Sequence, residues 1–174
     1  LIHDRDIFMR VDDSVIKVRS EKLEIGSEFR SSHFSVPTAQ FIRRSRGYVP
    51  EPIDLHDDGP DVLGCGADLK NTFTVTKGRF AIPGQHVGDM ENYETLQFFE
   101  ESLENMKAVY RVNPIAIAHD LHPDYLSTRW ALRQIPPCPL LSKGGMGGVY
   151  GIQHHYAHIG SVMAEHGLKS KVIG

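Results

Sequence analysis

The sequence QHHYAH at residues 153–158 places two histidines, His154 and His158, four residues apart. On a helix, side chains at this spacing lie on one face, so both imidazoles can bind one divalent metal ion. A third protein ligand, which we expect to be a carboxylate, is needed besides water or substrate. The alternative is a polar helix start whose histidines face solvent. The motif follows an expected strand, and because open α/β sheets bind ligands at the carboxyl ends of strands, this position favours the metal site.

A second polar motif, HDLHPDY at residues 119–125, also follows a short apolar segment. A His-Asp pair at the end of a strand can orient a base or hold a substrate amide. The candidate catalytic residues are therefore His119, Asp120 and His122. The alternative is helix capping, in which Asp124 is the N-cap and no chemistry is needed. The residues alone leave both interpretations open.

A third motif, GADLKNT at residues 66–72, is expected at a turn between two strands. Glycine lets the backbone approach a ligand, and Lys70 and Asn71 offer donors to phosphate oxygens. We take Asp68, Lys70 and Asn71 as candidate nucleotide- or phosphate-binding residues. The spacing is not that of a GxxxxGK[ST] phosphate loop, and the alternative is a plain hairpin turn.

Arginines gather before the middle of the chain. Arg43, Arg44 and Arg46 could each hold a phosphate or carboxylate through two parallel hydrogen bonds, and Arg5 and Arg10 could join them. We take Arg43 and Arg44 as further candidates for phosphate binding. The alternative is a solvated basic face.

The apolar pattern after residue 60 predicts a mixed sheet with helices on its faces, an α/β fold that brings these motifs to strand ends. We expect a tight turn at Lys77 and Gly78, a helix cap at Asn92 or Glu91, and a helix stop at Gly167. The expected order is strands at 62–66, 71–77 and 80–82, a helix at 92–110, a strand at 115–118, a helix at 124–133, a strand at 149–153 and a helix at 156–166.

The earlier part of the chain follows a different pattern. Alternation over residues 7–18 predicts a strand pair with a turn at residues 12–14, and the polar residues 19–40 predict a surface excursion. Three prolines and several acids between residues 50 and 60 are typical of an extended linker. We therefore expect a domain boundary with residues 53–60 as the linker, between domains at 1–52 and 61–174.

Composition narrows the function. The chain has 174 residues, 40% of them hydrophobic and 24% charged, as in a soluble globular protein. Its net charge of -3 does not favour nucleic-acid binding, and no apolar run is long enough to cross a membrane. Cys65 and Cys138 form no CxxC pair, which fits a reducing cytoplasm. Both ends break off at expected strands without a signal-peptide layout, so we expect an internal piece of a longer protein.

Taken in order, these motifs resemble the HypF family of hydrogenase-maturation carbamoyltransferases. Tyr156 departs from the family pattern, which has a third consecutive histidine there, and the stretches 19–40 and 134–148 are longer than expected. Segments resembling the end of the family's YrdC-like domain are 1–7, 10–15 and 43–52, and segments resembling the start of its TsaD-like transferase domain are 66–73, 85–89, 119–125 and 153–158.

The resemblance implies a first lobe of an actin/sugar-kinase (RNase H-like) domain, preceded by the C-terminal part of a YrdC-like α/β domain. It implies that carbamoyl phosphate and ATP form carbamoyl-adenylate, and that the carbamoyl group passes to the C-terminal cysteine of the partner HypE for cyanide ligand synthesis. His154 and His158 would bind a divalent metal, zinc or iron, with the third ligand expected outside this chain. The chain by itself is expected to be inactive. The alternatives are a tRNA threonylcarbamoyl transferase-like protein and a non-catalytic partner-binding fragment.

Overall fold

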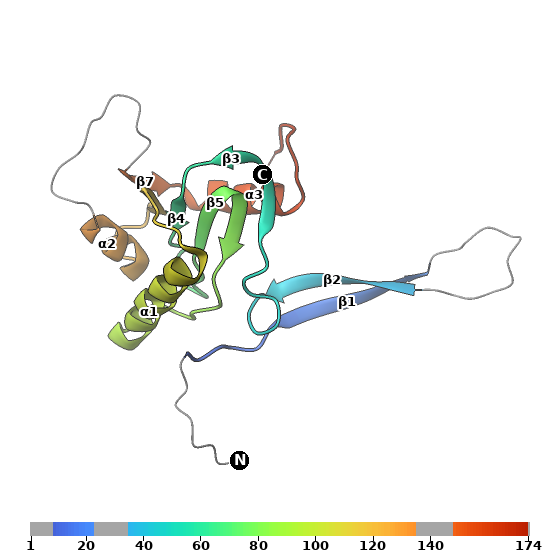
Figure 1. Ribbon diagram of the computed structural model, residues 1–174, viewed down its shortest axis with the longest axis horizontal. Helices are drawn as coiled ribbons and strands as arrows, with labels where there is room; N and C mark the ends of the chain where they lie inside the picture. Colours follow the sequence, from blue (N-terminus) through green and yellow to red (C-terminus); the bar gives the residue numbers. More distant parts are fainter. Residues whose placement is uncertain (1–8, 23–34, 135–147, 174) are drawn as a thin grey trace, which may run out of the picture.

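The computed structural model describes residues 9–22, 35–134 and 148–173, and within them the chain forms a two-stranded sheet, a five-stranded sheet and three helices (Figure 1). The predicted α/β class, a mixed sheet with flanking helices, is confirmed. None of the helices in these ranges is long and apolar enough to cross a membrane.

The two-stranded sheet is an antiparallel pair of β1 (Val15–Lys22) and β2 (Ser35–Arg43) that projects away from the rest of the fold (Figure 1). The predicted turn at residues 12–14 is wrong, because the described residues before β1, 9–14, form no strand that such a turn could join to it. Ser14 contributes its hydroxyl oxygen as acceptor to the backbone N–H of Ser45, at 2.8 Å, and so fixes the chain just after β2. Most of β2 lies in residues 19–40, which were expected to form a surface excursion. Their polar composition does not show the alternation of apolar and polar residues that would have predicted a strand.

The five-stranded sheet has the order β3-β5-β4-β6-β7. The strands β4, β6 and β7 are parallel neighbours, whereas β5 is antiparallel to both β3 and β4. Because parallel strands end at the same edge, the segments that follow β4, β6 and β7 meet there. The bounds are β3 Ile53–Gly59, β4 Val62–Gly64, β5 Thr74–Pro83, β6 Ala116–Asp120 and β7 Gly148–Ile152.

Two predictions about this sheet are wrong. Residues 53–59 of the expected linker form β3, whose Ile53 pairs with Ala81 and whose Asp54 makes an ion pair with Arg79. The expected tight turn at Gly78 is absent, because β5 runs through it as one strand. Gly78 pairs with Gly59, where the register of β3 shifts against β5. The positive φ of Gly78, 56°, therefore belongs to this β-bulge and not to a hairpin turn.

Three helices accompany the sheet: α1 (Tyr93–Tyr110), α2 (Leu126–Arg133) and α3 (His154–Glu165). The predicted cap of α1 is confirmed, because the Asn92 side chain accepts a hydrogen bond from the backbone N–H of Thr95 at 2.9 Å. α3 begins after β7 at one edge of the sheet and contacts β3 at the other, so it runs across the sheet.

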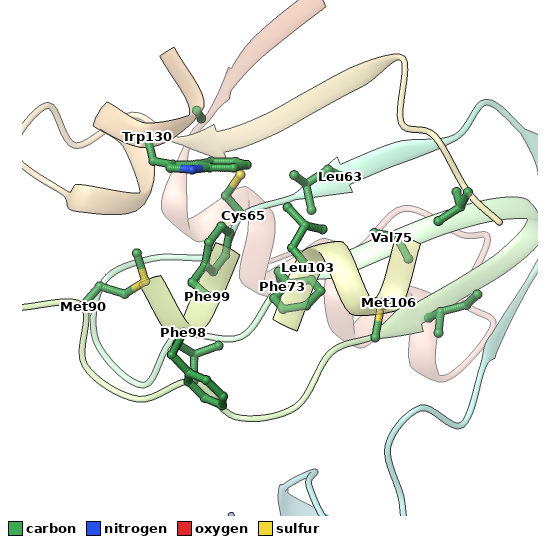
Figure 2. Packing of buried hydrophobic residues seen from close by; sticks show 14 residues of the cluster. Leu63, Cys65, Phe73, Val75, Met90, Phe98, Phe99, Leu103, Met106 and Trp130 are labelled. Atoms are coloured by element: carbon green, nitrogen blue, oxygen red, sulfur yellow. The ribbon is translucent and has the colours of Figure 1, made fainter. Parts of the chain in front are cut away.

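The hydrophobic core joins α1 and α2 to the sheet (Figure 2). Its centre is a row of aromatic rings in which Phe99 meets Phe73 and Trp130 edge to face, at centroid distances of 5.4 and 5.0 Å. Leu63 and Val75, from β4 and β5, are buried beside them. The core thus fixes β4, and with it the start of the 66–72 loop, whereas none of the residues of α3 is buried.

Candidate functional site

A cavity of about 580 Å³ lies at the carboxyl ends of β4, β6 and β7. All three polar motifs of the sequence contribute to its walls, as the parallel strands require. Its lining residues are Gly64, Cys65, Gly66, Ala67, Leu69, Lys70, Asn71, Thr72, Ala118, His119, Asp120, Tyr125, Ile152, His154, Ala157, His158 and Ser161.

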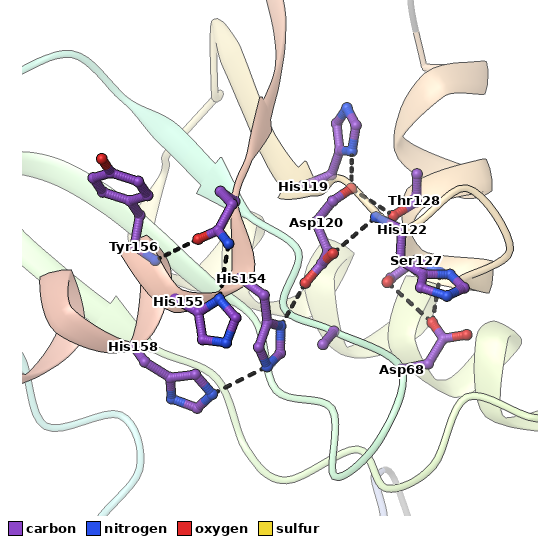
Figure 3. A network of polar contacts seen from close by, with 12 residues as sticks. Asp68, His119, Asp120, His122, Ser127, Thr128, His154, His155, Tyr156 and His158 are labelled. Atoms are coloured by element: carbon purple, nitrogen blue, oxygen red, sulfur yellow. Dashed lines mark hydrogen bonds and ion pairs between the residues drawn. The ribbon is translucent and has the colours of Figure 1, made fainter. Parts of the chain in front are cut away.

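The histidine pair opens α3. Gln153 is the N-cap, and its side-chain oxygen accepts a hydrogen bond from the backbone N–H of Tyr156 at 3.1 Å, so the first turn is fixed. The Nε2 atoms of His154 and His158 face each other at 3.1 Å (Figure 3). Two nitrogen atoms bound to one tetrahedral zinc at roughly 2.0–2.1 Å lie about 3.3 Å apart, so the pair fits a shared metal ion.

The pair does not form a complete metal site by itself. Within residues 9–22, 35–134 and 148–173, no group of three or more His, Cys, Asp and Glu side chains could hold a metal ion. Two nitrogen ligands therefore need at least one further ligand.

Asp120, the last residue of β6, contacts His154 from the side opposite His158 (Figure 3). Its Oδ2 lies 2.6 Å from Nδ1 of His154, and its Oδ1 accepts the backbone N–H of His122 at 2.8 Å. Burial would raise the pKa of Asp120, but the hydrogen bonds from His154 and from His122 outweigh it and lower the pKa. The carboxylate is thus ionised at neutral pH, and both of its oxygens are engaged.

The two other candidate catalytic residues differ in position. His119 is buried, lines the cavity and has its Nδ1 2.6 Å from the carbonyl oxygen of Asp120. His122 is exposed, stacks on Tyr125 at a centroid distance of 4.3 Å and is not among the residues that line this cavity. The structure therefore brings His119 and Asp120, but not His122, to the cavity wall; their catalytic roles stay predictions.

Asp68 caps α2 from a distance in the sequence. Its Oδ1 accepts hydrogen bonds from both the backbone N–H and the hydroxyl of Ser127, each at 3.0 Å, and its Oδ2 accepts the backbone N–H of Leu126 at 2.8 Å. The alternative that Asp124 caps this helix is wrong, because the N-cap is Tyr125, whose side chain makes no capping bond. Asp68 supplies the missing acceptors and ties the 66–72 loop to α2.

The other residues of this loop also hold its shape. The Asn71 side chain is buried and donates to the carbonyl oxygens of Cys65 and Ala67, at 2.9 and 2.6 Å. Its Nδ2 hydrogens are therefore not free for phosphate. Lys70 has a left-handed backbone, with φ of 51°, and its N–H donates to Asp89 at 2.6 Å. Lys70 is among the residues that line the cavity, and its ammonium makes no ion pair with any residue that the structure describes, so among the three candidates it is best placed for a phosphate.

The arginines lie elsewhere. Arg43 pairs with Asp12 at 2.6 Å, and Arg44 lies 3.5 Å from Glu165 of α3 and over the Phe41 ring. Neither is among the residues that line the cavity. Phosphate binding by these two residues stays a prediction, and Arg5 lies outside the described residues.

Two residues at the cavity, Ala157 and Ser161, were not singled out from the sequence. Ala157 and Ser161 face it one turn apart, and their spacing from His154 and His158 is the signal that could have identified them. Cys65 also lines the cavity, but burial raises the pKa of its thiol to about 12, so it is not a thiolate nucleophile at neutral pH. Cys138 lies outside the described residues.

Comparison with known proteins identifies one family and several relatives. The family described as "HypF Kae1-like domain" matches residues 57–165. The carbamoyltransferase HypF2 of Cupriavidus necator is 41% identical over the whole chain, and the carbamoyltransferase HypF of Rhizobium leguminosarum bv. viciae is 40% identical over 99% of it. The chain spans 19% of the length of each of these relatives.

Two solved structures are also similar. A full-length HypF crystallised in a phosphate- and nucleotide-bound form superposes with a TM-score of 0.76 at 36% identity, over all of this chain and 24% of that one. HypF of T. kodakarensis superposes with a TM-score of 0.67 at 34% identity, over 91% of this chain and 18% of that one. Their sequence identity and TM-scores support a common fold.

Proposed function

Because this chain belongs to the HypF family, through its Kae1-like domain, we propose that it forms one lobe of the domain that transfers a carbamoyl group in hydrogenase maturation. The full-length protein makes carbamoyl-adenylate from carbamoyl phosphate and ATP in the cytoplasm. It then passes the carbamoyl group to the C-terminal cysteine of HypE, as the precursor of a cyanide ligand. Residues 1–52 are the end of the adenylate-forming YrdC-like domain, and residues 61–174, together with β3 of the same sheet, belong to the transferring domain.

The observation that carries this proposal is that one cavity contains both a pair of possible metal ligands and a lysine that could bind phosphate. His154 and His158 offer paired nitrogen ligands, and Lys70 offers an ammonium group to phosphate oxygens. Carbamoyl-adenylate needs both, because its reacting carbonyl is attached directly to a phosphate. One solved relative, a full-length HypF, was crystallised in a phosphate- and nucleotide-bound form, so a protein of this family binds such ligands.

The residues of the cavity have separate tasks. His154 and His158 would hold a divalent metal, zinc or iron, through their Nε2 atoms. Such an ion, when bound, polarises a carbonyl or phosphoryl oxygen as a Lewis acid. Lys70 neutralises phosphate charge, and Gly66 lets the loop turn tightly beside it. Ala118, Ile152 and Ala157 form apolar parts of the cavity wall.

In the transfer step, the thiolate sulfur of the acceptor bonds to the carbamoyl carbon while the bond from that carbon to the AMP phosphate oxygen breaks. AMP leaves with the electron pair of that bond. The acceptor thiol is the partner's cysteine, since Cys65 is buried and protonated at neutral pH.

The test uses the full-length protein with His154→Ala and His158→Ala, and His166→Ala at the other end of α3 as the matched control. We expect both site variants to keep carbamoyl-phosphate-driven ATP–pyrophosphate exchange, because adenylate formation belongs to the other domain. Both should lose thiocarbamate formation on the HypE cysteine by at least about 100-fold, as loss of a metal ligand removes its Lewis acid.

The control should retain both reactions. Loss of exchange together with transfer would contradict the division of labour between the domains. Survival of both reactions in the site variants would show that the histidines are surface residues, and the metal proposal would fail.

A further inference from the structure

We infer that Asp120 is a positioning residue for the metal site: its carboxylate keeps the proton of His154 on Nδ1 and thereby turns the Nε2 lone pair toward His158. The inference rests on the proposed function, which assigns a metal to the two histidines. It changes the role of Asp120 from a candidate catalytic residue to the outer partner of a metal ligand.

The sheet register brings the two residues together. Asp120 ends β6 and lies opposite Ile152, which ends β7, and His154 starts α3 two residues later. The 34-residue separation in sequence is thus closed by one pair of parallel strands, to 2.6 Å between Oδ2 of Asp120 and Nδ1 of His154.

The carboxylate cannot rotate freely. Its Oδ1 accepts the backbone N–H of His122 at 2.8 Å, and the carbonyl oxygen of Asp120 accepts the hydroxyl of Thr128 at 2.9 Å. The Asp120 side chain is only 10% exposed, whereas that of His154 is 45% exposed. The fixed and largely buried carboxylate of Asp120 therefore holds the more exposed imidazole ring of His154.

This contact decides the tautomer of His154. A neutral imidazole carries one N–H, and Asp120 places it on Nδ1, so Nε2 of His154 is an acceptor. The 3.1 Å contact between the two Nε2 atoms is then a hydrogen bond donated by His158. A metal ion would take the place of that shared proton, with the lone pair of His154 already pointing at it.

The arrangement is the carboxylate–histidine–metal pattern, in which the outer carboxylate fixes ring orientation and raises ligand basicity. Loss of such a partner lowers metal affinity by roughly 10–100-fold. Both carboxylate oxygens of Asp120 contact neighbouring residues, Oδ1 through the His122 N–H and Oδ2 through His154, as a positioning role requires.

Asp120→Asn tests the inference without changing the shape of the side chain. If the amide oxygen stays on the His122 N–H, the amide NH₂ faces Nδ1 of His154 and pushes the proton to Nε2. Asp124→Asn is the matched control, since this exposed aspartate of the same motif pairs with Arg129 instead of a histidine. Circular dichroism confirms that each variant is folded.

Two measurements are made on the full 174-residue chain and on the full-length protein. Nitrogen-15 NMR of the histidine rings without metal reports the tautomer, and titration with Zn²⁺ reports affinity. We expect the Nδ1–H form of His154 in the parent and in Asp124→Asn, the Nε2–H form in Asp120→Asn, and zinc binding roughly 10–100-fold weaker only in the latter.

An unchanged tautomer in Asp120→Asn, or unchanged zinc affinity despite a changed tautomer, overturns the inference. A full-length parent protein that binds no Zn²⁺ but shows the tautomer switch refutes the metal in the proposed function, and it leaves the orientation of His154 by Asp120 supported. The two failures are therefore distinguishable.

Discussion

Replacing Asp68 by alanine removes the side chain that joins the loop after β4 to the first turn of α2. The change removes the two carboxylate oxygens that accept three hydrogen bonds: those from the backbone N–H groups of Leu126 and Ser127 and that from the buried Ser127 hydroxyl. Tyr125 provides no replacement, because its side chain makes no capping bond. The first turn of α2 would then have to find water for donors that the protein now satisfies.

The expected loss follows from these three hydrogen bonds. Loss of a helix cap costs about 0.5–2 kcal/mol, and a hydrogen bond to a charged group contributes about 1.5–3 kcal/mol. Asp68 is half-buried, so solvent competes for part of this energy. We expect Asp68→Ala to lower the free energy of unfolding by about 2.5 kcal/mol, and Tm by about 5–10 °C for a chain of this size.

The assay is urea unfolding followed by circular dichroism, on the parent and three variants. Asp68→Asn keeps one acceptor oxygen but turns an NH₂ group toward a backbone N–H, so we expect it to lose about half as much stability. Asp13→Ala is the control, because its side chain is 82% exposed and its ion pair with Arg46, at 3.5 Å, contributes less than about 1 kcal/mol.

A loss of less than about 0.5 kcal/mol in Asp68→Ala would refute the capping argument. If the full-length variant instead kept its stability but bound ATP or AMP more weakly, Asp68 would be a nucleotide-binding residue, as its position in the GADLKNT motif predicted.

Two further predictions concern the same loop and its surroundings. Gly66→Ala should lower the free energy of unfolding by about 3 kcal/mol or more in thermal or urea unfolding, since its φ is +69° and an added Cβ would lie 2.3 Å from the carbonyl oxygen of Thr72. Gly160→Ala, with open space at the Cβ in α3, should instead stabilise by about 0.5–1 kcal/mol, and equal effects would contradict the strain at Gly66. Because burial raises the pKa of Cys65 from 9.0 to about 12, the folded state favours the neutral thiol, so this contribution is complete below pH 9 and falls toward pH 12 by up to about 1.4 kcal/mol per pH unit. Cys65→Ala should lack this part of the decline in urea unfolding between pH 8 and pH 10.5, and parallel declines would argue against a buried neutral thiol.

The parts of the fold that were predictable are those in which a local signal agrees with the tertiary structure. Asn92 before an apolar 3.6-residue period predicts α1, because the cap and the buried face are both properties of one segment. The cavity was predictable in outline for a related reason. Three polar motifs each follow a short apolar strand, and parallel strands must end at the same edge.

The wrong predictions concern segments whose structure depends on contacts with residues far away in the sequence. Residues 53–59 contain acids and a glycine typical of a linker, yet the edge of β5 gives them hydrogen-bonding partners and they become β3. Gly78 is typical of a tight turn, but the irregularity in β3 opposite it lets β5 continue. The cap of α2 by Asp68 links residues 58 positions apart, and a sequence pattern gives no sign of such a contact.

The separation of Asp120 from the two histidines along the chain has a consequence for the order of folding. The Nε2 atoms of His154 and His158 come together as soon as the first turn of α3 forms, which for a helix takes on the order of a microsecond. Asp120 reaches His154 only when β6 and β7 have paired in parallel, a non-local step that must first close a long loop. A nascent chain therefore presents the two histidines before Asp120 can orient the ring of His154, which happens only once β6 and β7 have paired.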